Sequence, residues 1–156
     1  MKFLFILLLT IISCLGMATI LSCQDSLIYS EYRNISQASW DRRDTLTFHL
    51  PDTERPTDAS LSISVRTRQD FRYKTIALSV AHLLNDSLVS TDTLHITLHD
   101  ANGQSLGNAF YISDNYSRPL PLHIGKDEHH TLRITHIMRL NPLEAISNVG
   151  VFVERK

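Results

Sequence analysis

Cysteine is nearly absent from this sequence. The 156 residues include two, Cys14 and Cys23, and both lie close to the N-terminus. The chain beyond them has no thiol, so it can contain neither a disulfide framework nor a cysteine nucleophile. A fold without these crosslinks must be held together by packing alone.

Several catalytic and ligand-binding signatures are missing as well. The five glycines form neither a phosphate-binding loop nor a Gly-x-Ser-x-Gly nucleophile motif. Acidic residues are scattered, and a carboxylate pair assembled across strands would not be visible in the sequence. Basic and acidic residues nearly balance, 15 against 16, which is unlike the basic footprint of a nucleic-acid-binding protein. We therefore predict no catalytic residue, no cofactor and no nucleic-acid partner.

The N-terminus holds the long apolar run that the rest of the chain lacks. A short basic start, Met1-Lys2, is followed by an almost entirely apolar segment from Phe3 to Leu21, as in a secretory signal. Ile20-Leu21-Ser22-Cys23 then resembles the lipobox that signal peptidase II cuts directly before the cysteine. We predict a lipoprotein signal peptide at 1–22 and acylation of Cys23, which would anchor the mature chain in a lipid bilayer.

Two alternatives compete with cleavage before Cys23. Ile11-Ile12-Ser13-Cys14 has the same form, but cleavage there would leave the apolar Leu15–Leu21 at the start of the mature protein. Cleavage before Cys23 leaves the polar Gln24-Asp25-Ser26, which suits a tether. The apolar run is also long enough to span a bilayer, which needs ~20 residues, although an uncleaved anchor has no need of a lipobox.

The mature chain has the length of one domain. Residues 23–156 can bury a real core but are too few for two ordinary domains. We expect 23–40 to form the lipidated tether and the first strand, and 41–156 to form the remainder of a single β-sandwich domain.

Apolar residues alternate with polar ones along the mature chain, which is the period of half-buried strands. Helical periodicity is nearly absent. The clearest alternating segments are centred on Phe48, Ile63, Leu78 and Ile96, and further candidates are Leu106–Ile112, Leu132–Met138 and Val149–Val153. About eight short strands at this spacing predict an all-β fold, a single antiparallel β-sandwich of immunoglobulin-like or jelly-roll type.

Turn-forming residues separate these segments. Pro51–Asp58 is a turn-rich break, and both Asn85-Asp86-Ser87 and Asp100–Gly103 have the composition of tight turns. One helical turn is predicted at Asn141-Pro142-Leu143-Glu144, because Asn can cap a helix and Pro suits its first position.

The eight histidines do not have the spacing of a metal site. His95 and His99 share a strand face but lie ~13 Å apart in an extended chain, too far for one zinc ion with ~2 Å bonds. His129 and His130 are neighbours whose side chains would point to opposite faces. His136 falls on the apolar side of its segment, where we expect a hydrogen-bonded structural histidine. We therefore predict no metal ligand.

Four aromatic residues, Trp40, Tyr73, Tyr111 and Tyr116, have two interpretations. They could form an exposed surface that binds glycan or peptide. Aromatic residues at strand positions more often build the core or cross-strand pairs, so we favour the second interpretation.

Asp followed by a hydroxyl residue and Leu occurs four times, where random placement would give roughly one. The pattern resembles the O-glycan acceptor motif of exported Bacteroidetes proteins, with Ser26, Thr45, Ser87 and Thr93 as the candidate acceptors. The same residues also suit a turn that enters a strand, and the sequence favours neither interpretation.

A series of separated segments is distributed over nearly the whole chain after Cys23. They are Tyr32 and Trp40, Ser64-Val65-Arg66, Asp70-Phe71-Arg72-Tyr73, Thr91–Leu94, Leu98–Gly107, His136–Leu143 and Ile146–Val151. In these segments the chain resembles the gliding-motility-associated lipoprotein H family (GldH) of Bacteroidetes, most specifically in the last two. Ser105 and Asn108-Ala109 depart from the family pattern, which expects Trp and further glycines there.

The resemblance implies a role in the machinery of surface gliding and its associated protein secretion, with no catalytic residues to transfer. We expect a non-enzymatic accessory or assembly factor that is lipid-anchored in the cell envelope, faces the periplasm and contacts other envelope proteins of that machinery. Candidate partner contacts are Arg66, Tyr73 and Arg139, although salt bridges between strands would explain both arginines equally well. The alternative function is a lipid-anchored glycan- or peptide-binding module of the envelope.

Overall fold

The computed structural model describes residues 26–107 and 112–156. Within these residues the chain forms eleven strands and one short 3-10 turn, Ser36–Ala38. All the strand pairs are antiparallel. The prediction of an all-β fold with antiparallel sheets is therefore confirmed.

The larger sheet contains five strands in the order β1-β11-β4-β7, with β8 also paired to β4. Their bounds are β1 Leu27–Asn34, β4 Thr57–Arg68, β7 Ile112–Tyr116, β8 Leu120–Ile124 and β11 Ile146–Arg155. The long central strand β4 thus pairs with β7 through its C-terminal half and with β8 through its N-terminal half.

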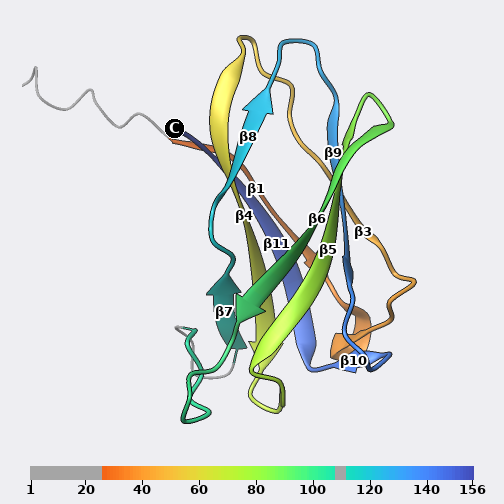
Figure 1. The fold of residues 1–156 in the computed structure, drawn as a ribbon, viewed down its shortest axis with the longest axis vertical. Helices are drawn as coiled ribbons and strands as arrows, with labels where there is room; N and C mark the ends of the chain where they lie inside the picture. The colour runs from red at the N-terminus through yellow and green to blue at the C-terminus, as the bar shows by residue number, and fades with distance from the viewer. Residues whose placement is uncertain (1–25, 108–111) are drawn as a thin grey trace, which may run out of the picture.

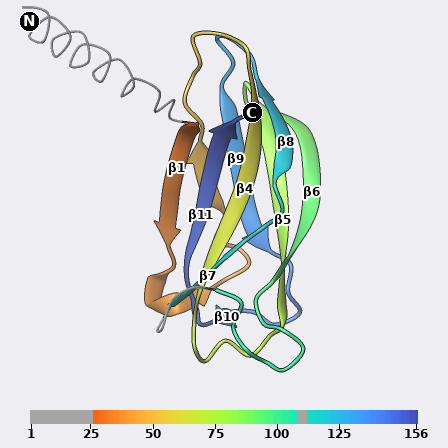
Figure 2. The ribbon, with the colours of Figure 1, turned by 90° about the vertical axis from the view of Figure 1, so that its left-hand side faces the viewer.

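The second sheet contains four strands in the order β3-β9-β5-β6. Their bounds are β3 Leu46–His49, β5 Thr75–Leu84, β6 Ser87–Thr97 and β9 His130–His136. A separate pair of two-residue strands joins β2, Ser39–Trp40, to β10, Leu143–Glu144. The two larger sheets face each other, as the two perpendicular views show (Figures 1 and 2).

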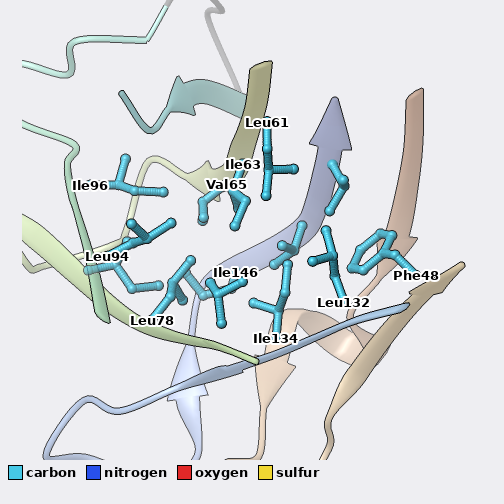
Figure 3. Packing of buried hydrophobic residues seen from close by; sticks show 14 of the residues in the cluster. Phe48, Leu61, Ile63, Val65, Leu78, Leu94, Ile96, Leu132, Ile134 and Ile146 are labelled. Atoms are coloured by element: carbon cyan, nitrogen blue, oxygen red, sulfur yellow. The ribbon is translucent and has the colours of Figure 1, made fainter. Parts of the chain in front are cut away.

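The core fills the space between these sheets (Figure 3). Alternate residues of each strand enter it: Leu61, Ile63 and Val65 come from β4, and Leu132 and Ile134 come from β9. Full burial of such a side chain contributes roughly 1.5–3 kcal/mol. Alternation of period two is therefore the property of the sequence that creates both sheets and their common core.

Most of the predicted strands are observed. The alternating segments around Phe48, Ile63, Leu78 and Ile96 lie in β3, β4, β5 and β6, and Val149–Val153 lies in β11. The segment predicted at Leu132–Met138 is β9, which begins at His130 and ends at His136.

Other boundaries were wrong. The predicted break Pro51–Asp58 ends early, because Thr57 and Asp58 already pair with β8. Strand β8 was missed, since Pro121 interrupts its short alternation. In the candidate strand Leu106–Ile112, the first two residues lie outside any strand, 108–111 lie outside the described residues, and β7 begins only at Ile112.

The predicted helical turn at Asn141-Pro142-Leu143-Glu144 was also wrong. Leu143 and Glu144 form β10, whose backbone pairs with Trp40 and Ser39, and the Asn141–Pro142 peptide bond is cis. Local capping propensity is weak, and here a tertiary strand pairing overrides it.

The predicted tight turns are confirmed: the first closes the hairpin of β5 and β6, and the second closes an isolated bridge between His99 and Ser105. Asn85 and Asp86 both have positive φ, 48° and 62°, a geometry that Asn and Asp tolerate and that suits the twist of a two-residue hairpin loop. At the second turn the carboxylate of Asp100 accepts hydrogen bonds from the backbone N–H groups of Asn102 and Gln104, each at 2.8 Å.

The strands run between two ends of the molecule. One end, which we call the tether end, carries Ser26, the 50–56 loop, the Asn85-Asp86 turn and the 125–129 loop. The opposite end, which we call the far end, carries the 69–74, 98–107 and 137–142 loops (Figure 1). The twelve residues of β4 separate the ends by ~40 Å.

Among the residues that the structure describes, no helix has the length and apolarity needed to cross a membrane.

Candidate functional site

A pocket of about 300 Å³ opens at the far end, and we call it the distal pocket. Two segments that are distant in the sequence form it. Its lining consists of Asp70, Arg72, Tyr73, Leu140, Pro142, Leu143 and Glu144. The first three lie in the connection between β4 and β5, and the others lie in and before β10.

The first wall is fixed by the core beneath it. After β4 ends, the backbone N–H of Phe71 donates to the carbonyl of Arg68 at 3.2 Å, and the Phe71 side chain is buried. The Tyr73 ring packs edge-on against Phe71, with 5.5 Å between the ring centroids. His99 Nδ1 lies 3.0 Å from the Tyr73 carbonyl, which ties this segment to the end of β6. Tyr73 therefore stands on a rigid support.

The second wall is held by Arg42. Its backbone N–H donates to Asn141 Oδ1 at 2.6 Å, and its guanidinium donates to the carbonyls of Met138 and Arg139. Ser39 Oγ also donates to Glu144 Oε1 at 2.7 Å. These bonds connect the 137–144 segment to the residues around β2 and so hold the second wall of the pocket in place.

The chemistry of the distal pocket suits an apolar group. Tyr73, Pro142 and Leu143 give apolar walls, and Leu140 at the rim is 56% exposed. Charged groups of both signs surround this centre: Asp70, Arg72 and Glu144. An apolar centre with a polar rim is the anatomy of a protein-binding hot spot.

The three predicted partner contacts lie in different places. Tyr73 lines the distal pocket, and Arg139 is exposed directly before Leu140. Arg66 lies instead on the outer face of the five-stranded sheet, where its Cζ is 3.8 Å from the centroid of the Tyr32 ring. The structure brings two of the three to the far end, and their role as partner contacts stays a prediction.

Of the four aromatic residues considered as a possible binding surface, Trp40 packs in the core. Trp40 is fully buried, its indole N–H donates to the Asp44 carbonyl at 2.8 Å, and its ring lies edge-on to His136. Trp40 is therefore a core residue and not part of an exposed binding surface. Tyr116 is 54% exposed beside Phe152, and Tyr111 lies outside the described residues.

His136 is a buried structural histidine, as predicted. It is fully buried, and its Nε2 lies 3.0 Å from the Trp40 carbonyl. Burial lowers the pKa of its imidazole.

Two histidines, His82 and His130, lie in contact at the tether end. His82 Nε2 is 2.9 Å from His130 Nδ1, and His130 Nε2 is 3.1 Å from Glu128 Oε2. Burial, and then the charge of His130, lower the pKa of His82, while the Gly125 N–H and His130 lower that of Glu128. Among residues 26–107 and 112–156, no group of three or more His, Cys, Asp or Glu side chains could hold a metal ion.

The candidate acceptor hydroxyls Ser26, Thr45, Ser87 and Thr93 are all on exposed residues. Accessibility is necessary for O-glycosylation, which stays a prediction.

The predicted signal peptide 1–22, the lipidated Cys23 and the competing Cys14 lie outside the described residues.

Comparison with known proteins assigns the chain to a family. The family model described as GldH lipoprotein matches residues 27–153. The chain belongs to the GldH lipoprotein family.

Two curated relatives support this membership. The gliding motility lipoprotein GldH of Flavobacterium johnsoniae is 23% identical over 145 residues, which cover 86% of this chain and 89% of the relative. A GldH homolog of Christiangramia forsetii is 26% identical over 143 residues, which cover 86% and 87%. This GldH-family chain is thus a gliding-related lipoprotein, as its motifs predicted.

A solved structure was also matched, that of dimeric latent PorU from Porphyromonas gingivalis. The match has a TM-score of 0.37 and 13% sequence identity, and it covers 89% of this GldH-family chain but 14% of the PorU chain.

Sequence reasoning found the segments of the distal pocket but not the pocket. Asp70–Tyr73 and His136–Leu143 were both singled out as GldH-like, and the fold brings them together at the far end. Arg42 was missed, because its function as a support depends on tertiary contacts that no local pattern signals.

Proposed function

We propose that this protein is a non-enzymatic accessory or assembly factor of the gliding and associated secretion machinery, lipid-anchored through Cys23 and facing the periplasm. In this proposal the distal pocket binds a protein partner of the envelope. The anchor holds the domain at the membrane, and the pocket is presented ~40 Å away from the anchored end.

The observation that carries the proposal is the position of the distal pocket. A tether of three residues, Gln24-Asp25-Ser26, would keep the tether end within roughly 15 Å of the acylated cysteine. The pocket is lined by residues of the far end, so in this proposal it faces away from the anchoring bilayer. A partner surface at that end can meet other envelope proteins away from the bilayer.

The lining favours a protein partner over a glycan. A pocket of about 300 Å³ accepts one large apolar side chain. Carbohydrate recognition would call for several convergent hydrogen-bonding groups, whereas the centre here is built from Tyr73, Pro142 and Leu143, and the charged groups lie around it. We therefore propose that an aliphatic or aromatic side chain of the partner enters the pocket.

The test is affinity purification of the tagged full-length protein from gently solubilised envelopes of its host, followed by mass spectrometry. Wild type should recover gliding or secretion components, and Leu140→Asp should lose them, because a charge at the rim opposes burial of an apolar side chain. Cys23→Ala should lose them as well, since it removes the anchor.

Leu106→Asp is the matched control, because Leu106 is 54% exposed at the same end but does not line the pocket. It should retain the partner. Equal recovery by wild type and Leu140→Asp would refute the role of the distal pocket, and a wild-type protein that is recovered alone would refute the assembly role.

We also propose that the fold is the jelly-roll form of a β-sandwich. If β7 and β8 count as one interrupted strand, eight main strands pair first with last: β1 with β11, β3 with β9, β4 with β7 and β8, and β5 with β6. This is one long hairpin wrapped into two sheets, and jelly rolls consist of eight strands in two Greek keys.

A further inference from the structure

Strand β6 is the longest edge strand of the described part of the molecule. It has eleven residues, whereas the other edge strands have eight in β1, four in β3 and five each in β7 and β8. Edge strands invite pairing with other chains, and proteins usually protect them with lysine, proline or bulges. β6 contains no Lys, Arg or Pro, and its one bulge, at Val89, leaves Ser90–Thr97 regular.

The direction of the free backbone groups follows from two hydrogen bonds. Leu98 N–H donates to the Lys74 carbonyl, so the even residues of β6 bond to β5. Ile137 N–H donates to the Ala77 carbonyl, so the odd residues of β5 bond to β9, which agrees with this alternation. The N–H and C=O groups of the odd residues of β6 therefore point away from the sheet.

These outward groups belong to Thr91, Thr93, His95 and Thr97, all exposed. Within the part of the chain that the structure describes, no hydrogen bond occupies their outward N–H and C=O groups. β7 approaches the C-terminal end of β6 (Figure 1), which leaves Thr91, Thr93 and His95 as the accessible stretch. Threonine is also a residue that favours strand pairing.

We infer that β6 is a docking edge for an extended segment of another polypeptide, which adds a fifth strand to the four-stranded sheet. A row of alternating backbone donors and acceptors is complementary to another extended backbone. Asp92 is the one Asp, Glu, Lys or Arg residue of β6, and Asp86 precedes it at the turn. A segment with a basic residue opposite Asp92 fits this strand best. This site is separate from the distal pocket.

A second copy of this chain does not fit the same edge in a bilayer. A symmetric pair of β6 strands is antiparallel, so it would place the two tether ends at opposite ends of the dimer. The ends are ~40 Å apart along β4, so both acylated cysteines could not reach one leaflet. This step rests on the proposed anchoring at Cys23.

The test compares Thr93→Pro with Thr93→Val in the full-length acylated protein. Proline removes the outward N–H of residue 93 and leaves the bonds to β5 in place, a position where edge strands tolerate it. Valine keeps that N–H. Both variants lack the hydroxyl, so loss of a glycan at Thr93 would affect them equally.

Hydrogen–deuterium exchange of residues 87–97 would be measured in isolated host envelopes and again after purification in detergent. For wild type and Thr93→Val, exchange should be on the order of tenfold slower in envelopes. Thr93→Pro should lose this protection while the amides of β4 and β9 stay as protected as in wild type, which shows that the fold is intact.

Two results would overturn the inference. One is equal exchange of wild-type residues 87–97 in envelopes and in detergent. The other is recovery of untagged copies with tagged ones through a contact that Thr93→Pro abolishes, because the occupant would then be a second copy. The distal-pocket variant Leu140→Asp should keep the β6 protection, so the two proposals can fail separately.

Discussion

Gly150 lies beneath the ring of Tyr32 on the outer face of the five-stranded sheet. A Cβ at position 150 would come within 2.6 Å of Tyr32 Cε1. The ring cannot move freely, because Arg66 stacks on it and Phe152 contacts its edge. We predict that Gly150→Ala lowers the free energy of unfolding by about 1–3 kcal/mol, as overpacking does elsewhere. Urea denaturation measures this change.

The double variant separates this steric explanation from a backbone effect. In a Tyr32→Ala background the added methyl group has no ring to displace, so Gly150→Ala should cost much less than in wild type. The same cost in both backgrounds would contradict the proposed contact between Gly150 and the ring.

The half-buried His82 and the fully buried His136 give a pH dependence with a definite sign. Burial lowers the pKa of His82 and of His136 in the folded state, so the unfolded chain binds protons first as the pH falls. Stability should therefore be full above pH ~6.5, the ordinary histidine value, and should decline as the pH drops below it. Thermal midpoints measured between pH 8 and pH 5.5 would show the decline.

Replacing one of these histidines tests whether it causes the loss of stability at low pH. His82→Gln should flatten the decline between pH 7 and pH 5.5, even if it lowers stability at pH 8 through the lost contact with His130. His95→Gln is the control, because His95 is exposed and should leave the slope unchanged. A wild-type stability that rises on acidification would contradict the prediction.

At the scale of elements, the distal pocket depends on a loop held from another part of the chain. The Asn141 side chain accepts a hydrogen bond from the Arg42 backbone, and the Arg42 guanidinium binds two carbonyls of the 137–142 loop. We predict that Asn141→Ala loosens this loop and weakens partner recovery, with a loss of stability of about 1 kcal/mol. Hydrogen–deuterium exchange of residues 137–144 should become faster.

Asn102→Ala is a suitable comparison, because Asn102 lies in another loop of the far end and does not line the pocket. It should leave both the exchange of 137–144 and the recovery of the partner as in wild type. Unchanged exchange in Asn141→Ala would show that Arg42 alone holds the loop.

The strands with a buried face were predictable, and those defined by their partners were not. The sequence predicts β4, β5 and β6 because alternate residues, such as Ile63, Leu78 and Ile96, must enter the core, which gives an apolar–polar alternation. β10 exists because Leu143 and Glu144 pair with β2, a contact between residues about a hundred positions apart that no local pattern encodes. The distal pocket was hidden for the same reason, since its two walls meet only after the sheets have formed.

At the scale of the whole molecule, the tether leaves from one end and the distal pocket opens at the other. The mature chain should carry no thiol beyond the acylated Cys23, so a single added cysteine can be labelled alone. We predict that a fluorophore on Asp127→Cys, at the tether end, transfers energy efficiently to acceptor lipids in a vesicle that holds the acylated protein. The same label on Arg139→Cys should transfer weakly, because it lies ~40 Å farther from the anchored end.

The two labelled positions control for each other, since both residues are exposed and lie in loops. Efficient transfer from both would mean that the domain lies flat on the bilayer, and stronger transfer from position 139 would mean that the far end faces it. Either result would contradict the arrangement in which the pocket meets its partner away from the membrane. Efficient transfer from position 127 together with weak transfer from position 139 requires the strands to extend away from the bilayer. In that orientation the unpaired edge of β6 is also accessible along its length.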